Sequence, residues 1–166
     1  MADCEAVLEL NRAVVEVTSP MDAERFRELY QFSSIRLSVV LEEKVVGFVL
    51  AMEEGCGYDN GNYAWFEERL RKFLYIDRVV VSGECRGHGA GRSLYAHLFA
   101  EAERLGLLSV CAEMDREPPN EASLRFHQEM GFVPIGTRVL ESGKTVSMQL
   151  CSLDRDREED SRTVVV

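Results

Sequence analysis

Hydrophobic and polar residues follow two periodicities along the chain, one helical and one strand-like, and their order predicts the elements of an α/β fold. Apolar residues recur at helical spacing in residues 3–17. A second helix is predicted next, with Thr18, Ser19 or Asp22 as its alternative N-cap. Residues 35–53 contain two apolar runs joined by Glu-Glu-Lys, which predicts an antiparallel hairpin.

The second half of the chain alternates between strand and helix patterns. A turn-rich, aromatic insert comes first and ends in a predicted helical segment, 63–72. The expected order is helix, helix, strand, strand, insert, strand, helix, strand, helix, strand, strand, which favours an α/β (α+β) fold with a mixed, mainly antiparallel sheet. After the insert, the strands are expected at 73–81, 107–114, 131–140 and 144–150, with helices at 91–105 and before Gly131.

Length and composition favour one soluble domain. We expect the chain of 166 residues to form a single domain over 1–153, followed by an acidic tail over 154–166 that holds the segment DRDREED. No apolar stretch approaches the ~20 residues that span a bilayer, and the acidic N-terminus is unlike a secretory signal. The net charge of −10 disfavours nucleic acid as a partner.

The cysteine and histidine residues are too scattered for a metal site. Five cysteines are spread along the chain without a CxxC pair, which argues for reduced thiols in a cytoplasmic protein. The three histidines are also widely separated. We therefore expect neither a disulfide framework nor a metal ion.

The segment CRGHGAGR, residues 85–92, lies between a predicted strand and a predicted helix. Glycines let the backbone approach a ligand closely, and the free N–H groups at a helix start favour anions, so a phosphate is expected here. The nucleotide P-loop is rejected because no Lys-Ser or Lys-Thr follows these glycines. A dinucleotide site has the right context, with Glu113 as its acid, but the spacing is GxGxG and no second βαβ half follows.

The third interpretation is Arg-x-x-Gly-x-Gly, formed by Arg86, Gly89 and Gly91. Together with N-x-x-S-x-x-F-H-x-x-x-G-F at 120–132, this pattern resembles the acyl-CoA site of the GNAT superfamily of N-acetyltransferases. The stretches YDNGNYAWF, FLYIDR, EPPN and FHQEMGF are similar to a branch of predicted acetyltransferases within it. The resemblance covers residues 34–151 and implies a three-layer fold with helices on both faces of the sheet, and acetyl-CoA as cosubstrate.

The resemblance also implies which residues contact acetyl-CoA. In the family, the strand pairs with the pantetheine arm, the pyrophosphate lies on N–H groups at the helix start, and Asn120 faces the pantetheine. The alternatives are that Asn120 only caps a helix, and that Arg86 and Arg92 are solvated. The residues implied are Val79, Val81, Arg86, Gly87, His88, Gly89, Ala90, Gly91, Arg92, Asn120, Ser123 and Phe126.

Acetyl transfer to an amine needs a neutral amine, a polarised carbonyl group and a proton for the departing thiolate. Side chains alternate along a strand, so Tyr75, Asp77, Val79 and Val81 are expected on one face. The family often places a base near position 75 or 77. Asp77 is therefore the candidate base, and a salt bridge to an arginine is its structural alternative.

His127 occupies the position where most family members have the tyrosine that protonates the thiolate. Imidazole can donate that proton near neutral pH, so His127 is the candidate acid. Tyr75 and Tyr95 are the next candidates. His88 and His97 are expected to be exposed or packing residues.

The insert supplies the candidate acceptor site. Its mixture of aromatic and polar side chains is typical of an amine pocket, and a surface loop anchored by Trp65 and Phe66 is the alternative. A cationic substrate would be held by Asp59, or by Glu113 or Asp115 on the following strand. The candidate acceptor residues are Tyr58, Asp59, Asn62, Tyr63, Trp65 and Glu113.

The sequence thus predicts a cytoplasmic N-acetyltransferase that transfers an acetyl group from acetyl-CoA to a primary amine of a small molecule or peptide. Acyl groups other than acetyl stay open. The alternative is a non-catalytic CoA-binding or regulatory protein of the same fold, and a nicotinamide oxidoreductase is a distant third. Family members often pair through their C-terminal strands, so the resemblance also implies a homodimer.

Overall fold

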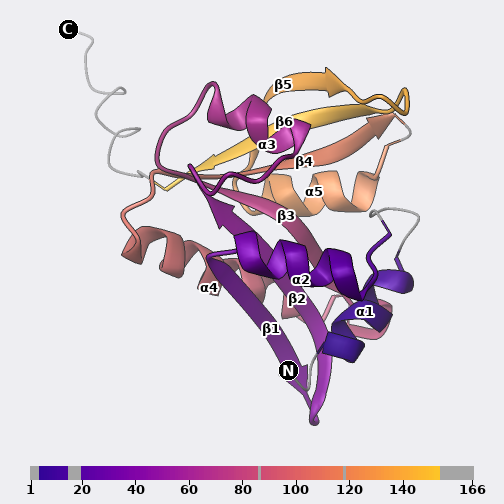
Figure 1. Ribbon diagram of the computed structural model, residues 1–166. Helices are drawn as coiled ribbons and strands as arrows, with labels where there is room; N and C mark the ends of the chain where they lie inside the picture. The colour runs from indigo at the N-terminus through magenta and orange to yellow at the C-terminus, as the bar shows by residue number, and fades with distance from the viewer. Residues whose placement is uncertain (1–3, 15–19, 86, 118, 154–166) are drawn as a thin grey trace, which may run out of the picture.

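A computed structural model describes residues 4–14, 20–85, 87–117 and 119–153, which form one six-stranded sheet with helices around it (Figure 1). The strand order is β1-β2-β3-β4-β6-β5, and β3–β4 is the parallel pair among antiparallel ones. The predicted order of elements and the mainly antiparallel sheet are confirmed. The elements are α1 Cys4–Arg12, α2 Ala23–Phe32, β1 Ile35–Leu41, β2 Lys44–Glu53, α3 Gly61–Glu67, β3 Phe73–Val81, a 3-10 turn Gly83–Cys85, α4 Ala90–Arg104, β4 Ser109–Glu117, α5 Glu121–Glu129, β5 Val133–Val139 and β6 Thr145–Ser152.

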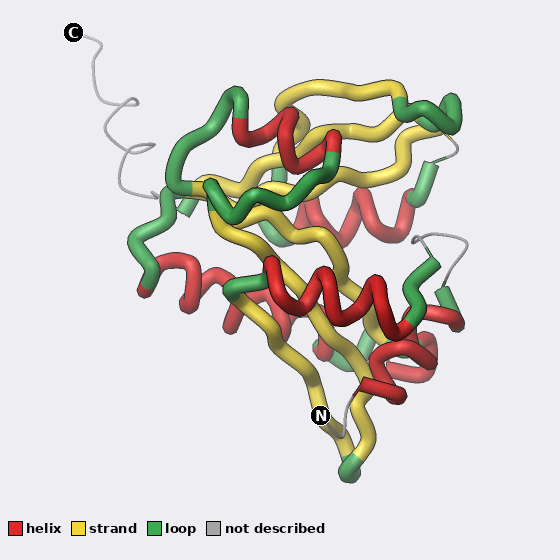
Figure 2. Tube along the Cα trace, in the orientation of Figure 1, coloured by secondary structure: helices red, strands yellow, loops and turns green. Residues whose placement is uncertain are grey.

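Helices cover both faces of the sheet, which confirms the predicted three-layer architecture (Figure 2). On one face α1, α2 and α3 pack around a core that includes Leu29 and Phe66. On the other face α4 and α5 pack around a second core that includes Leu94 and Leu98. All four of these side chains are at most 2% exposed, so each face has its own close-packed layer.

The two outer layers begin where local capping starts each helix. The side chain of Asp22 accepts a hydrogen bond from the Arg25 N–H at 2.8 Å, so Asp22 is the N-cap of α2; Thr18 and Ser19 lie outside the described residues. In the insert, Asn60 accepts from the N–H groups of Asn62 and Tyr63. This cap starts α3 earlier than predicted, and α3 also ends earlier, at Glu67. The predicted helix over 63–72 is therefore wrong at both ends.

β3 contains a β-bulge at Asp77. Leu50 on β2 pairs with Arg78, and the next residue Ala51 pairs with Ile76, so Asp77 is the extra residue on β3. A bulge makes the alternation of side chains skip a step. Asp77 and Arg78 both contact residues of the α1–α3 layer, whereas Val79 and Val81 pack in the α4 layer. The prediction that Tyr75, Asp77, Val79 and Val81 share one face is therefore wrong.

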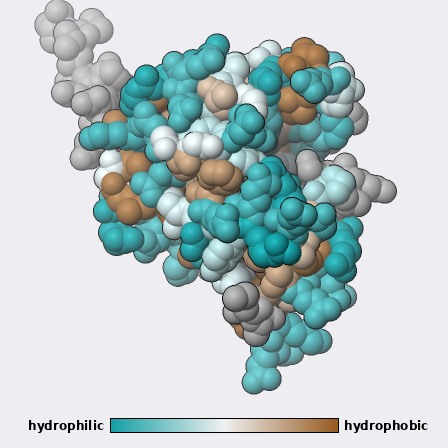
Figure 3. Space-filling model, viewed as in Figure 1, coloured by the Kyte–Doolittle hydropathy of each residue, from teal (hydrophilic) through white to brown (hydrophobic). Residues whose placement is uncertain are grey.

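The outer surface is mixed in character. Hydrophilic residues cover most of the visible face, including α2, and hydrophobic ones form small separate groups (Figure 3). The outer strand β5 exposes Val133 and Val139, and the homodimer implied by the resemblance stays a prediction. Among the described residues, no helix is both long and apolar enough to span a bilayer, and no cluster of three His, Cys, Asp or Glu side chains is placed to bind a metal ion. All five cysteines are free thiols.

Candidate active site

The parallel strands β3 and β4 separate soon after they pair. Their pairing covers three residues on β3, from Phe73 to Tyr75, although β3 continues to Val81 and β4 to Glu117. Figure 1 shows β4 diverging from β3. In the described part of the chain, the β3 edge that faces β4 therefore has no strand partner beyond Tyr75. At Asp77 the accessible part is the backbone. The side chain is only 6% exposed, whereas the residue as a whole is half-buried.

The glycine loop presents an open backbone surface at the start of α4. Gly87 and Gly89 have φ of 78° and 84°, and a Cβ added at either position would meet no atom within 4 Å. Gly89 is the N-cap, and the helical ladder begins with the Ser93 N–H donating to its carbonyl at 2.9 Å. The N–H groups of the first helical turn precede this ladder and are free to bind an anion. Arg86 lies outside the described residues.

Two contacts beside this loop join the start of α4 to α5, and a third lies deeper in the core. Arg92 forms an ion pair with Glu129 at 2.6 Å. The ring of Phe126 packs over Gly91, where an added Cβ would lie 3.2 Å from it. Asn120 caps α5 by accepting from the Ser123 N–H at 3.2 Å, so its capping role is confirmed. Two candidate ligand-binding segments, one from each motif, are thus held side by side.

The third and most buried contact is a hydrogen bond of 2.5 Å between the Tyr95 hydroxyl and His127 Nε2. His127 Nδ1 lies 2.8 Å from the Ser123 carbonyl oxygen, which can only accept. Nδ1 therefore carries the hydrogen, and Nε2 accepts from Tyr95. Burial lowers the pKa of His127 to about 4, so the imidazole is neutral at pH 7. His88 and His97 are exposed, as predicted.

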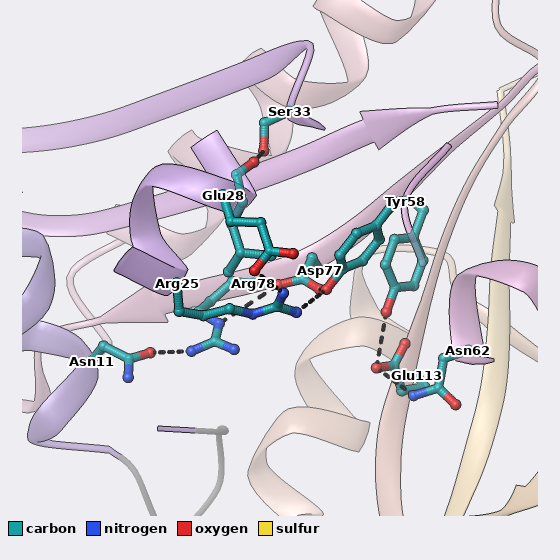
Figure 4. A network of polar contacts seen from close by, with 11 residues as sticks. Asn11, Arg25, Glu28, Ser33, Tyr58, Asn62, Asp77, Arg78 and Glu113 are labelled. Atoms are coloured by element: carbon teal, nitrogen blue, oxygen red, sulfur yellow. Dashed lines mark hydrogen bonds and ion pairs between the residues drawn. The ribbon is translucent and has the colours of Figure 1, made fainter. Parts of the chain in front are cut away.

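On the opposite face of the sheet, two carboxylates lie close to the point where β3 and β4 separate (Figure 4). Asp77 Oδ1 accepts from the Tyr58 hydroxyl at 2.7 Å. Glu113 Oε1 accepts from Asn62 at 2.8 Å and from the Tyr75 hydroxyl at 3.1 Å. The second oxygen of each carboxylate, Asp77 Oδ2 and Glu113 Oε2, is buried without a hydrogen-bond partner in the described structure. Arg78 forms an ion pair with Asp77 Oδ2 at 3.7 Å. For Glu113 Oε2, a buried oxygen without a partner is costly, which points to a proton or a cation that completes it.

Burial changes the acidity of both carboxyl groups. It is the largest cause that raises the pKa of Glu113 to about 7, and the charge of Asp77 adds to it. It also raises the pKa of Asp77, against the hydrogen bond from Tyr58 and the charge of Arg78. Burial and the charge of Glu113 raise the pKa of Tyr75 well above its usual value, so Tyr75 is a neutral donor here and not a base. The site therefore contains one carboxyl group that titrates near neutral pH.

Arginines lie at the outer end of each hydrogen-bond chain. Arg25 on α2 donates to the Tyr58 hydroxyl at 2.5 Å, and Arg138 on β5 donates to Asn62 at 2.5 Å. Arg78 donates to Asn11 at 2.9 Å and lies 3.7 Å from Asp77. The salt bridge expected as the structural alternative for Asp77 is thus found with Arg78, whereas the sequence analysis missed Arg25 and Arg138. The sequence carried a signal only for Arg78, because Asp-Arg inside a buried strand indicates a charged pair.

The candidate acceptor residues separate into two groups. Tyr58 and Asn62 lie in the carboxylate cluster with Glu113, whereas Asp59 is exposed on the loop before α3. The Tyr63 hydroxyl donates to the Glu53 carbonyl and so holds the insert to β2. Trp65 packs against Gly136 of β5, where an added Cβ would lie 2.7 Å from its ring. Another residue considered for the amine, Asp115, forms an ion pair with Lys144 at 3.0 Å. The predicted site residues that meet in the carboxylate cluster are thus Tyr58, Asn62, Tyr75, Asp77 and Glu113.

Comparison with known proteins identifies the family. The model of the acetyltransferase (GNAT) family matches residues 5–132. An L-methionine sulfoximine/L-methionine sulfone acetyltransferase of Salmonella typhimurium is 29% identical over 135 residues, which is 79% of this chain and 75% of that protein.

Solved structures share the fold at lower sequence identity. Ard1 from Thermoplasma volcanium superposes with a TM-score of 0.73 and 17% identity over 91% of each chain. The ribosomal-protein-S18-alanine N-acetyltransferase from Escherichia coli superposes with a TM-score of 0.69 and 14% identity, over 92% of this chain and 89% of that one. The family match covers most of the chain and includes the glycine loop, the separated strands and the carboxylate cluster, so this chain is a member of the GNAT acetyltransferase family.

Proposed function

We propose that this acetyltransferase moves an acetyl group from acetyl-CoA to the primary amine of a small molecule, with Asp77 and Glu113 receiving the amine. One observation carries the proposal. Two buried carboxylates, each with an oxygen that accepts no hydrogen bond in the described structure, lie where β3 and β4 separate, on the face opposite the glycine loop. Arg78 pairs with the Asp77 oxygen at 3.7 Å, and an ammonium group would supply the cation for Glu113 Oε2.

The residues around the glycine loop fit acetyl-CoA. The open surface at Gly87 and Gly89 and the free N–H groups at the start of α4 suit a pyrophosphate. The unpaired edge of β3 at Val79 and Val81 suits an extended amide chain, which can hydrogen-bond as a further strand would. When bound, acetyl-CoA supplies an acetyl group activated as a thioester.

Glu113 takes the proton from the amine. An alkylammonium group has a pKa of ~10.4 and an α-ammonium group one of ~8, so most of the substrate arrives charged. Its charge is attracted to Asp77, and a carboxyl group whose pKa is about 7 is matched to accept its proton at Glu113 Oε2. This assigns to Glu113 the role that the sequence analysis gave to Asp77, and Asp77 holds the cation.

On the other face, the leaving sulfur departs as a thiolate and takes the second proton that the attacking nitrogen loses, while Glu113 takes the first. The neutral imidazole has no proton to spare at Nε2, because Nδ1–H is donated to Ser123. The Tyr95 hydroxyl donates its hydrogen to Nε2, and burial raises the pKa of Tyr95, so it is no better a proton donor. In this proposal the pair therefore joins α4 to α5, and the acid role predicted for His127 is not retained.

A small amine fits better than the end of a folded protein. The carboxylates lie beneath α2 and the insert, and Tyr58, which contacts Asp77, is 3% exposed. The Salmonella relative is named for two small amino-acid derivatives, which supports the same choice. A peptide amine would have to enter this covered space as an extended chain.

Calorimetric titration with acetyl-CoA, with NAD as the comparison ligand, tests the cosubstrate. Gly89→Glu is expected to weaken acetyl-CoA binding at least 100-fold, because it adds both a side chain and a negative charge to the loop. Gly143→Glu is the matched control, since Gly143 also has a positive φ of 83° and open space around it but lies in the β5–β6 turn. Equal binding by both variants, or binding of NAD in place of acetyl-CoA, would contradict the proposal.

A further inference from the structure

Carboxylates lie on the inner side of the cluster, and two arginines line a hollow on its outer side. From this we infer that the acceptor amine belongs to a zwitterion, a free α-amino acid or a compound of that class, and that Arg25 binds its carboxylate. The inference rests on the proposed function, since it names the class of amine that enters the same site.

The inner side is negative. Asp77 Oδ2 and Glu113 Oε2 are both buried without a hydrogen-bond partner in the described structure, and the Asp77 side chain is 6% exposed. Arg78 forms an ion pair with Asp77 Oδ2 at 3.7 Å, whereas no such ion pair is found for Glu113 Oε2 among the described residues. A positive group of the ligand is therefore expected against the carboxylates.

The outer side contains two arginines. A surface hollow of about 410 Å³ lies between α1 and α2, and Arg12 and Arg25 both line it. The acidic residue in its lining, Asp22, accepts from the Arg25 backbone N–H as the cap of α2. The lining thus holds two arginines and one aspartate, and Arg25 also forms an ion pair with Glu28 at 2.6 Å. An anionic group of the ligand is expected here.

Arg25 connects the two sides. Its guanidinium donates to the Tyr58 hydroxyl at 2.5 Å and to Glu28 at 2.6 Å, which leaves three of its five N–H donors for a ligand. The same Tyr58 hydroxyl donates to Asp77, so one hydroxyl group separates the guanidinium from the inner carboxylate (Figure 4). Asn11 lines the hollow as well and accepts from Arg78 beside Asp77.

This short distance selects the class of ligand. A cation and an anion that bind one hydroxyl apart must be close together in the ligand, as the ammonium and carboxylate of an α-amino acid are. A simple alkylamine would leave Glu28 as the anion on the guanidinium and its remaining donors without a ligand carboxylate. The N-terminus of a peptide has a neutral amide in place of the carboxylate, so it would lose the same contact.

The test compares acceptors that differ only in the carboxylate. The twenty standard L-amino acids are offered with acetyl-CoA to the purified full-length protein, and N-acetyl products are measured by mass spectrometry. The best acceptor is then compared with its carboxamide and with the amine that remains after loss of the carboxylate. We expect kcat/KM to be at least tenfold higher for the amino acid than for either analogue. The carboxamide has the less basic amine, so a preference for the amino acid would not come from amine reactivity.

Two variants locate the effect. Arg25→Gln is expected to lower the ratio of kcat/KM between the amino acid and its decarboxylated amine at least tenfold. Arg27→Gln removes the same charge from an exposed position on the same helix and is expected to leave that ratio unchanged. Thermal unfolding of both variants checks that they fold. If Arg25→Gln does not fold, the comparison of the acceptors with the wild-type protein still tests the inference.

The outcomes separate this inference from the proposed function. Acetylation of the carboxamide or the decarboxylated amine as efficiently as the amino acid would overturn the zwitterion and leave amine acetylation in place. An unchanged ratio in a folded Arg25→Gln would overturn the role of Arg25. If none of the twenty amino acids is acetylated although acetyl-CoA binds, the inference is overturned, and simple amines and peptides then test the proposed function separately.

Discussion

Replacing Glu113 with glutamine is expected to stabilise the protein at neutral pH and to remove most of its activity. Burial, with the charge of Asp77, raises the pKa of Glu113 from an ordinary 4.5 to about 7. Between these pH values the folded chain binds more protons than the unfolded chain, so stability falls as the pH rises. At ~1.36 kcal/mol for each unit of pKa difference, the ionised carboxylate costs the folded state up to about 3 kcal/mol above pH 7.

Glutamine keeps the shape of the side chain and the Oε1 acceptor for Asn62 and Tyr75, but it cannot ionise. The variant and the wild type should therefore have similar free energies of unfolding near pH 4.5. At pH 8 the variant should exceed the wild type by up to about 3 kcal/mol, or roughly 6–12 °C in Tm for a chain of this size. Loss of the base should lower kcat/KM by ~10²–10⁴-fold.

Urea unfolding at pH 4.5 and pH 8, with thermal scans at both, measures the stability difference, and acetyl-CoA turnover with an amine measures the activity. Glu117→Gln is the control, because it makes the same chemical change at an exposed position on β4. It should alter stability by less than about 0.5 kcal/mol. The reasoning fails if Glu113→Gln is less stable than the wild type at pH 8, or gains as much at pH 4.5 as at pH 8.

Two further variants test the other buried groups. Asp77→Asn should raise the KM for the amine about tenfold through loss of one charge-assisted contact. It should also move the acid limb of the pH–rate profile to lower pH, because the Asp77 charge raises the pKa of Glu113. An acid limb at the same pH in the variant would contradict this coupling. His127→Gln tests the buried imidazole. Burial lowers the pKa of His127 to about 4, below its ordinary 6.5, so stability from the neutral ring is lost as the pH falls through this window. The stability advantage of the wild type over His127→Gln should shrink by about 3 kcal/mol from pH 7 to pH 4, as urea unfolding would show; a constant difference would contradict it.

The elements of the fold were readable from the sequence because each has its own periodic pattern. β3 is found at the predicted residues 73–81, and α4 begins at Ala90, one residue before the position predicted. The helix in the insert was misplaced because its start depends on the Asn60 cap, a short-range signal inside a stretch rich in turn residues. Patterns that repeat along an element are thus predictable, whereas boundaries set by a single side chain are not.

The candidate site was only partly readable, because it depends on contacts between distant segments. Asp77 and Glu113 were both singled out, but the sequence analysis did not place them in one charge cluster. Arg25 and Arg138 reach that cluster from α2 and β5. Neither arginine differs from an ordinary surface residue in its local sequence. Only the order of strands in the sheet brings these residues together.

The bulge at Asp77 explains how one strand serves both faces of the enzyme. In a regular strand, Val79 and Val81 would lie on the same face as Tyr75 and Asp77. The extra residue reverses the alternation after Asp77, so the carboxylate stays in the α2 layer while the two valines turn toward α4. A Cβ added at Gly91 would lie 3.8 Å from the side chain of Val81, which shows that the valine reaches the start of α4. We therefore interpret the bulge as the feature that places the carboxylate proposed to bind the amine and the valines proposed to bind acetyl-CoA on opposite faces of one strand, a few residues apart.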